Sequence, residues 1–476
     1  MSFFLATVPR GVLLYHGNTS PESPSEPDWL AYEIEHAEQF AHPFRRRPPP
    51  GGPPGGPPRG PPGEPPRGPP GGPPPEFASE HPDTEEQHVI GDGELKRSEQ
   101  EEGWLHVYRA TKPLQLLYVD GMGGGKTSMG TLDTQDHLLR GLRSTPLSTK
   151  KPLKARGGGP MGERERANEL CELAEAWGLH GILRMEAGFE IIMCDFKNDL
   201  EEIQALRRAD RNDRRERDSG INRLEGLRGF AERYQGIGAS RTLVDYSSMV
   251  SAFFFPVNLT NPDERRPDLP RLVNVSDSEL NVIKKYIHES IDLRRDVDLA
   301  PINWQGISDL IVGRYADRIE FMANSKSSDV LVDELNFLLD VFIHYPENDG
   351  EPDLSEAVTR CGEFYLQSIA LSTEADRYIH AAFQAVTSEI CSTLFEVRER
   401  LSSSTKVITS DLESSTDALR SLISFLGWSR FKRCSGCDLS EVCFIPMWPM
   451  GSVEDYENPR CKNGSGLHGG DSYWKM

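Results

Sequence analysis

The sequence lacks long apolar runs, an excess of positive charge and a recognisable leader at its first residues. No apolar stretch approaches the roughly 18–20 residues that a membrane-spanning helix needs, so we predict no such helix. Lys and Arg number 53 against 74 Asp and Glu, which leaves a net charge of −21. Because a phosphate backbone would repel such a chain as a whole, we expect no nucleic acid partner.

The first residues carry neither the basic segment nor the apolar core of a signal peptide. The eight cysteines are nevertheless an even number, and even counts are typical of disulfide-bonded proteins. Four N-x-S/T sequons begin at Asn18, Asn258, Asn274 and Asn463. Together these features favour the secretory pathway or the cell exterior, with a leader absent from this chain, and leave a cytoplasmic location as the alternative.

A chain of 476 residues is too long for one ordinary core, so we expect two to three domains. Residues 48–75 are proline and glycine except at three positions, and such a composition cannot form a packed element. Strand and helix patterns stand on both sides of this tract. We therefore predict an α+β domain over 1–42 and 103–270, interrupted by a disordered insertion at 43–102.

Within this first domain, short β-rich runs at 11–17, 29–32, 114–119 and 188–195 predict strands. Helical spacing of apolar residues predicts helices over 34–40 and 164–177. The charged segment 199–218 mixes acids and bases, and we expect an exposed helix or linker there.

From about residue 276 the apolar period becomes helical. The runs 328–345 and 375–401 each place apolar side chains on one helical face, which must be buried against a neighbour. We predict a helical domain over 276–428, with Cys361 and Cys391 as possible disulfide partners on neighbouring helices.

The last segment, 429–476, contains four cysteines at 434, 437, 443 and 461. A tetrahedral zinc site favours an opening Cys-x2-Cys pair, but a second such pair is absent. In an oxidising compartment two disulfides would stabilise the segment equally well. Both alternatives stay open, disulfides are favoured, and we assign no metal ligands.

A glycine-rich segment at 119–128 follows a β-rich run and ends in Lys126 and Thr127. A phosphate-binding loop needs glycines whose N–H groups converge on phosphates, a lysine and a hydroxyl for magnesium. Gly125, Lys126 and Thr127 fit this pattern, with Asp195 as a magnesium-holding acid. Asp120, however, occupies the position of the opening glycine. A glycine-rich turn between a strand and a helix is therefore the favoured interpretation.

A second set of residues is scattered over the first 195 positions. It comprises Tyr15-His16-Gly17 at a strand end, residues 29–32 with the following helix, and the apolar strand from Phe189 to Asp195. In this order the set resembles the ADP-ribosyltransferase superfamily of the His-Tyr-Glu type. The resemblance implies a split-sheet fold and NAD as cofactor.

The resemblance also assigns roles to single residues. His16 and Gly17 would bind NAD, Tyr32 would stack on the nicotinamide, and Glu190 would be the catalytic residue. The acceptor would be an unknown protein or small molecule. From the residues alone, Glu190 is equally explained as an edge residue or as a core acid paired with Arg184.

Over nearly its whole length the chain resembles an uncharacterised family of filamentous fungal proteins, which brings no established activity. The resemblance rests on residues 13–17, 29–32, 116–121, 183–186, 194–196, 234–240 and 441–449. Three functions therefore stay open, and whether the chain is an enzyme stays open with them. They are an NAD-dependent mono-ADP-ribosyltransferase or inactive relative, a P-loop nucleotide-binding enzyme, and a non-enzymatic secreted structural or interaction protein.

Overall fold

The computed structural model describes most of the chain. The described residues are 1–41, 102–141, 162–208, 224, 226–229, 236–296, 301–347, 350–402, 409–434, 436–464 and 472–475. Nearly all of the predicted insertion at 43–102 lies outside them.

The first part of the chain is built on a nine-stranded mixed sheet in the order β8-β4-β2-β3-β7-β6-β5-β1-β9. Neighbouring strands are antiparallel except β5 and β6, which run parallel. The strands are β1 (Ser2–Val8), β2 (Leu13–Asn18), β3 (Asp28–Ala31), β4 (Gly103–Ala110), β5 (Leu114–Val119), β6 (Gly181–Met185), β7 (Phe189–Met193), β8 (Leu200–Arg208) and β9 (Leu243–Ser251).

Helices cover one face of this sheet. They are α1 (Ile34–Phe40), the π-helix η1 (Asp133–Leu139), α2 (Glu163–Ala176) and α5 (Asp277–Asp296). Their apolar residues join those of the strands in one core, which includes Trp29, Leu170 and Ile287. The opposite face of the sheet has its own core, to which the short helix α3 (Phe196–Asp199) contributes. A single-turn helix η4 (Ala252–Phe254) follows β9.

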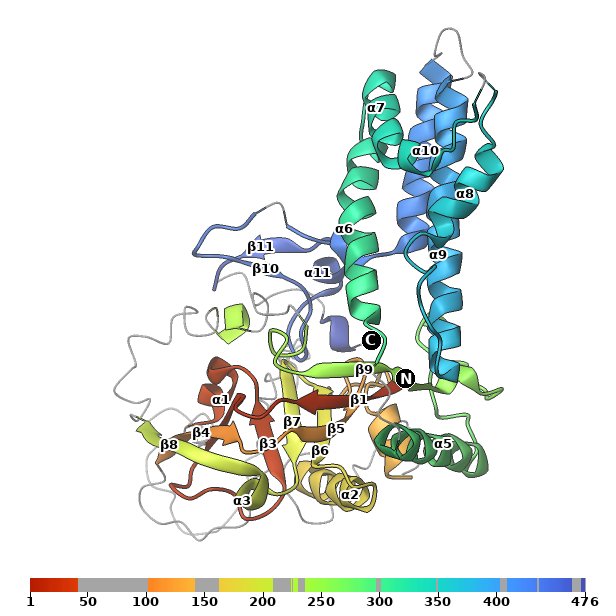
Figure 1. The fold of residues 1–476 in the computed structure, drawn as a ribbon. Coiled ribbons are helices and arrows are strands. Elements are labelled where there is room, and N and C mark those ends of the chain that lie inside the picture. Colours follow the sequence, from red (N-terminus) through yellow and green to blue (C-terminus); the bar gives the residue numbers. More distant parts are fainter. Residues whose placement is uncertain are drawn as a thin grey trace, which may run out of the picture.

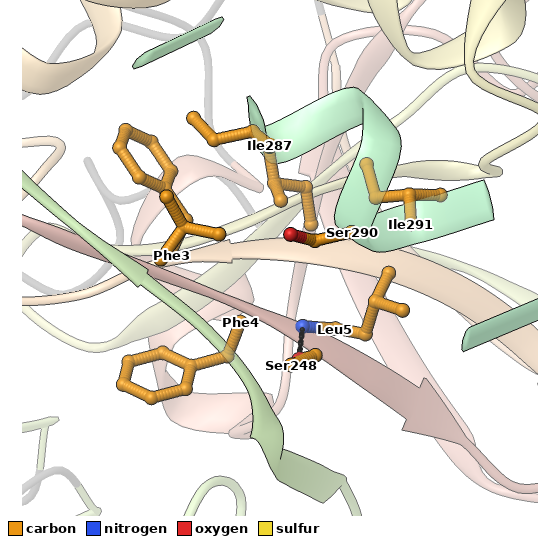
Figure 2. Close-up of a pocket in the computed structure, with 9 residues that line it drawn as sticks. Phe3, Phe4, Leu5, Ser248, Ile287, Ser290 and Ile291 are labelled. Carbon is orange, nitrogen blue, oxygen red and sulfur yellow. Dashed lines mark hydrogen bonds between the residues drawn. The ribbon is translucent and has the colours of Figure 1, made fainter. Parts of the chain in front are cut away.

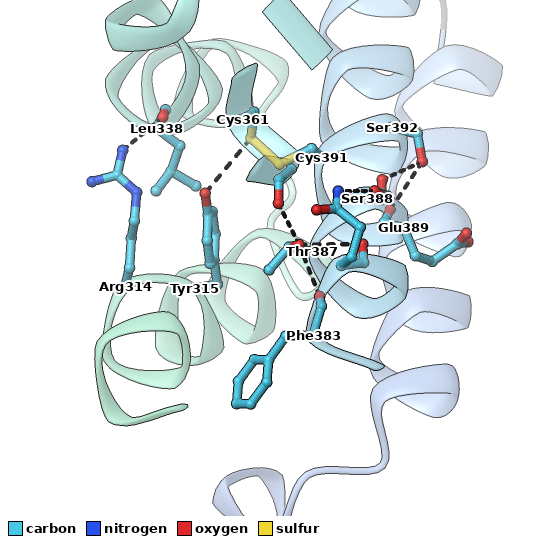
Figure 3. The surroundings of a disulfide bond; sticks show 12 residues. Arg314, Tyr315, Leu338, Cys361, Phe383, Thr387, Ser388, Glu389, Cys391 and Ser392 are labelled. Atoms are coloured by element: carbon cyan, nitrogen blue, oxygen red, sulfur yellow. Dashed lines mark hydrogen bonds between the residues drawn. A yellow bond between two sulfur atoms is a disulfide. The ribbon is translucent and has the colours of Figure 1, made fainter. Parts of the chain in front are cut away.

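The later helices form a column that stands away from the sheet in Figure 1. They are α6 (Trp304–Ala323), α7 (Ser328–Leu339), η5 (Asp340–Phe342), α8 (Leu354–Glu363), α9 (Glu374–Ser402) and α10 (Thr409–Leu426). Their apolar faces surround a separate core. A disulfide between Cys361 and Cys391 joins α8 to α9 (Figure 3), which confirms the predicted pairing.

The last segment contains η6 (Ser429–Phe431), β10 (Val442–Phe444), α11 (Val453–Glu457), β11 (Arg460–Lys462) and η7 (Tyr473–Lys475). Its two strands pair, with Cys443 opposite Cys461. The Sγ atoms of Cys434, Cys437 and Cys461 lie within 4.8 Å of one another. The sulfurs are joined as the disulfides Cys434–Cys443 and Cys437–Cys461, which is the favoured alternative.

The predicted α+β class is confirmed, and the ADP-ribosyltransferase-like arrangement stays a prediction. The expectation of a helix or linker was wrong over 200–208, which form strand β8. Helix α5, placed by sequence in the helical domain, packs its apolar face into the core of the sheet. None of the described helices has both the length and the apolar character needed to cross a membrane.

Candidate functional site

The parallel strands β5 and β6 end at the same edge of the sheet, and charged residues gather there. Lys126 lies in the loop after β5, and Glu186 directly follows β6. The Lys126 ammonium donates a hydrogen bond to the Glu186 carboxylate. It also lies 3.3 Å from Oε1 of Glu163, which opens α2 above this edge. All three side chains are almost fully buried.

Arg184 on β6 is the second buried cation of this cluster. Its Nε donates to Glu190 Oε1 at 2.7 Å, and its Nη2 donates to Glu163 Oε2 at 2.8 Å. The same Nη2 is 3.5 Å from Glu186 Oε2. Nη1 donates to Gln135 on η1 at 3.2 Å. Lys126, Glu163, Arg184, Glu186 and Glu190 therefore form one connected network, here called the charged cluster.

Burial and neighbouring charges shift the pKa of two carboxyls of the charged cluster, Glu163 and Glu186. Burial raises the pKa of the Glu186 carboxyl to about 7, against the opposing effect of the Lys126 ammonium. Burial acts in the same direction on Glu163, but the cations of Arg184, Lys126 and Arg166 outweigh it and hold the pKa of Glu163 below its usual value. Of Glu163 and Glu186, Glu186 is therefore the carboxyl that more readily takes up a proton.

Three of the four glycines of the 119–128 loop have their backbone donors occupied. The N–H of Gly123 donates to the Gly121 carbonyl, that of Gly124 to Met185, and that of Gly125 to Met122, at 2.8, 2.8 and 3.1 Å. A Cβ at Gly124 would lie 2.9 Å from Cβ of Glu186. These glycines therefore let the loop pack closely against the end of β6, as a glycine-rich turn does.

The C-terminal segment covers this edge of the sheet. The Lys126 ammonium lies 5.3 Å from the centre of the Trp448 ring. A Cβ at Gly125 would lie 3.5 Å from the same side chain. Phe444 and Met447 pack with Ala187, directly after Glu186. The charged cluster is thus enclosed between the sheet, α2, η1 and a disulfide-bonded segment.

The nucleotide-loop residues are not brought together. Lys126 and Thr127 lie beyond the end of β5, whereas Asp195 follows β7, which runs antiparallel to β6. Asp195 is therefore at the opposite edge of the sheet, where it caps α3 by accepting from the N–H groups of Lys197 and Asn198. The Thr127 hydroxyl is hydrogen-bonded to that of Thr131 at 2.9 Å.

The residues predicted to act on NAD are divided between the two faces of the sheet. Ala31 of β3 is paired directly with Glu190 of β7, so these two side chains lie on the same face of the sheet. Tyr32 follows Ala31 in the chain and therefore points to the opposite face. His16 lies on the face of Tyr32, because its neighbour Tyr15 is opposite Ala31. The three side chains therefore do not line one cleft, and their roles toward NAD stay predictions.

Each of these side chains is also engaged inside the protein. Nδ1 of the fully buried His16 is 2.8 Å from the Trp29 carbonyl, and the Tyr32 hydroxyl is 2.5 Å from that of Thr242. A Cβ at Gly17 would lie 2.0 Å from the Ala37 carbonyl, so α1 packs directly on this glycine. Glu190 is a buried acid that pairs with Arg184, as the alternative interpretation of this residue from the sequence proposed.

A small cavity lies elsewhere, between β1, β9 and α5 (Figure 2). Its volume is about 10 Å³, and it is lined by apolar side chains with Ser248 and Ser290. Such a volume holds about one water molecule, far less than a nucleotide needs.

Comparison with known proteins connects the chain with uncharacterised fungal proteins. Residues 1–216 match a family model described as the YPL277C N-terminal domain. The uncharacterised protein YOR389W of Saccharomyces cerevisiae is 25% identical over 529 residues, covering 95% of this chain and 79% of the relative. The uncharacterised protein YPL277C of the same yeast is 33% identical over 208 residues, covering 43% of this chain and 38% of the relative. No solved structure matches the chain.

Proposed function

We propose that this chain is a disulfide-stabilised structural or interaction protein of the secretory pathway, in which the charged cluster stabilises the fold. One observation carries the proposal: the groups that would bind a phosphate are occupied by the protein itself. The Lys126 ammonium has two carboxylate partners, and the N–H groups of Gly123, Gly124 and Gly125 donate to backbone carbonyls. Binding a phosphate would require breaking these contacts.

The cysteines support the location. All eight are joined in four disulfides, including Cys171–Cys194 between α2 and the end of β7. Such pairing is typical of proteins that fold in an oxidising compartment. The sequon asparagines Asn258, Asn274 and Asn463 are exposed, as attachment of a glycan requires.

Thermal unfolding with NAD and, separately, with Mg-ATP tests the proposal, because a ligand that binds only the folded state raises the midpoint by mass action. We expect no shift with either ligand at millimolar concentration. An NAD-dependent rise that Glu190→Gln abolishes would instead support the transferase. A rise with Mg-ATP that Lys126→Met abolishes would support the P-loop enzyme. Arg420→Met, at an exposed ion pair on α10, is the matched control for both variants.

The location has its own test. The chain expressed with a secretory leader should lose mass on treatment with an N-glycosidase. Peptide mapping should then find deamidated asparagine at one or more of Asn258, Asn274 and Asn463. Efficient secretion of a chain without glycans, with free thiols, would contradict the proposed location.

A further inference from the structure

Strand β8 forms an open edge of the sheet. It ends the strand order beside β4, and among the described residues no strand pairs with its outer side. Figure 1 shows it at the side of the sheet away from the helical column. Its residues 201–207 are all exposed, on both faces. The opposite edge differs, because α5 and α9 pack against β9.

Exposed edge strands invite pairing with another chain, and proteins commonly block them with proline, charged side chains, bulges or a short strand length. Strand β8 has nine residues and no proline, whereas strands average five to six residues. Its apolar side chains Ile203 and Leu206 are 41% and 39% exposed. The edge is thus long and partly apolar, and one bulge is its single irregularity.

The bulge determines which residues of β8 share a face. The register with β4 shifts between Val107 and Tyr108, which leaves Ile203 as the extra residue. Because alternate residues of β4 point to the same face of the sheet, the β8 residues opposite them also form two sets, one on each face. Glu202, Ala205 and Arg207 share one face, opposite Tyr108, His106 and Trp104 of β4. Glu201, Gln204, Leu206 and Arg208 share the other face, opposite Arg109, Val107, Leu105 and Gly103.

The charges of β8 are self-complementary. Two acids stand at its start and two arginines at its end, so an antiparallel copy places acids opposite bases. With a two-fold axis through Ala205, Gln204 faces the partner's Leu206. Glu202 then faces the partner's Arg207, and Glu201 faces the partner's Arg208. The two members of each pair share a face of the sheet because the bulge at Ile203 shifts the alternation of faces by one residue.

We propose that two copies of this chain associate through β8, as antiparallel neighbours in one continuous sheet. The contact is isologous, so every ion pair occurs twice, and the main-chain groups of both open edges become paired. The proposal is independent of the function proposed above, since it rests on the edge of the sheet and not on the charged cluster.

Existing contacts of these charges are compatible with this arrangement. Glu201 pairs with Arg109 at 2.5 Å, Arg208 with Glu38 at 2.8 Å, and Arg207 with Glu102. Glu202 accepts from His106 at 2.6 Å. A carboxylate accepts several hydrogen bonds and a guanidinium donates several, so pairs across the two-fold axis extend these pairs into networks.

Sedimentation velocity over a range of concentrations tests the proposal. We expect a dimer of twice the 53.3 kDa chain mass, plus any glycans. Arg207→Glu places like charges opposite each other at two positions and should weaken the dimer about tenfold or more. The matched control Arg420→Glu reverses an arginine of similar exposure, 55% against 63%, in an exposed ion pair on α10 and should leave the dimer unchanged.

A cysteine at the two-fold axis tests the register. Ala205→Cys should form an intermolecular disulfide on a non-reducing gel, because directly opposite residues of antiparallel strands lie within disulfide distance. Asp417→Cys, on exposed α10, is the control and should not. A chain that is monomeric at every concentration would overturn the proposal. So would a dimer that both arginine reversals weaken equally, or an Ala205→Cys variant that does not cross-link.

Discussion

At the scale of single residues, the protein buries carboxyls in two different ways. Glu163 and Glu190 are paired with the buried Arg184. Asp28 on β3 instead has no cation in direct contact within the described residues, and its Oδ1 accepts from the Trp29 N–H at 2.8 Å. Its Oδ2 is 3.9 Å from Nε2 of His16. Burial lowers the pKa of that histidine to about 3, so it stays neutral near pH 7.

Asp28 should make the free energy of unfolding depend on pH. Burial raises the pKa of Asp28 to about 7. Its contribution to stability is therefore complete below about pH 4 and is lost as the pH rises through 7. Asp28→Asn imitates the protonated form. We expect the variant to match the natural protein near pH 4 and to exceed it by roughly 4 kcal/mol at pH 9, measured by urea unfolding, because each unit of the pKa shift is worth about 1.4 kcal/mol. Parallel stability curves between pH 5 and pH 9 would contradict this.

Sequence reasoning identified part of the charged cluster. Both Lys126 and Glu190 were candidate site residues, although for two different functions, and Arg184 was named as a partner of Glu190. Glu163 and Glu186 were missed, because only the parallel pairing of β5 and β6 brings the residue after β6 to the loop after β5. The short apolar run Ile182-Leu183 just before this acid was the available signal, but strand β6 itself was not predicted.

At the scale of elements, local patterns predicted several of the helices and strands whose apolar faces are buried, but not strand β6. Helix α1 was expected over 34–40 and has these bounds, and α9 was expected within one residue at each end. Strand β8 was missed because its charged, exposed residues carry neither alternation nor an apolar run. Its conformation follows from hydrogen bonding to β4, which a local pattern does not contain.

The contact of α1 with β2 depends on Gly17, where an added Cβ would lie 2.0 Å from the Ala37 carbonyl. Because a backbone atom cannot yield as a flexible side chain does, Gly17→Ala should force α1 away and lower stability by about 2 kcal/mol or more. The matched control is Gly313→Ala in α6, where a Cβ meets no atom within 4 Å. It should raise stability by about 0.5–1 kcal/mol. Thermal unfolding of both variants tests the pair, and equal effects would contradict the account.

At the scale of the whole molecule, the chain is held by a core on each face of the sheet, a third core among the later helices, and four disulfides. The sequence predicted the change from mixed structure to helices and one disulfide pairing. It did not predict that α5 belongs to the core of the sheet, because helical period shows which face is buried but not against which element. The pairing of Cys171 with Cys194 was also missed, since these residues meet only through the packing of α2 on the sheet.

The Cys361–Cys391 disulfide should contribute to the stability of the helical column. It links residues 30 positions apart, and removing such a link typically costs about 2–4 kcal/mol. We expect the double variant Cys361→Ser, Cys391→Ser to lose this amount in urea unfolding without reductant. In the natural protein, thiol titration under denaturing, non-reducing conditions should find no free cysteine. Free thiols there, or an unchanged stability of the variant, would contradict the pairing.

The central claim is that the charged cluster stabilises the fold. The most direct measurement is the free energy of unfolding of Lys126→Met, with Lys126→Met, Glu186→Leu as its companion. If the claim holds, the single variant loses roughly 3 kcal/mol because a buried carboxylate loses its cation, and the double variant recovers most of that loss. A ligand-binding lysine is instead commonly kept at a cost to stability. A single variant as stable as the natural protein, or more stable, would contradict the claim.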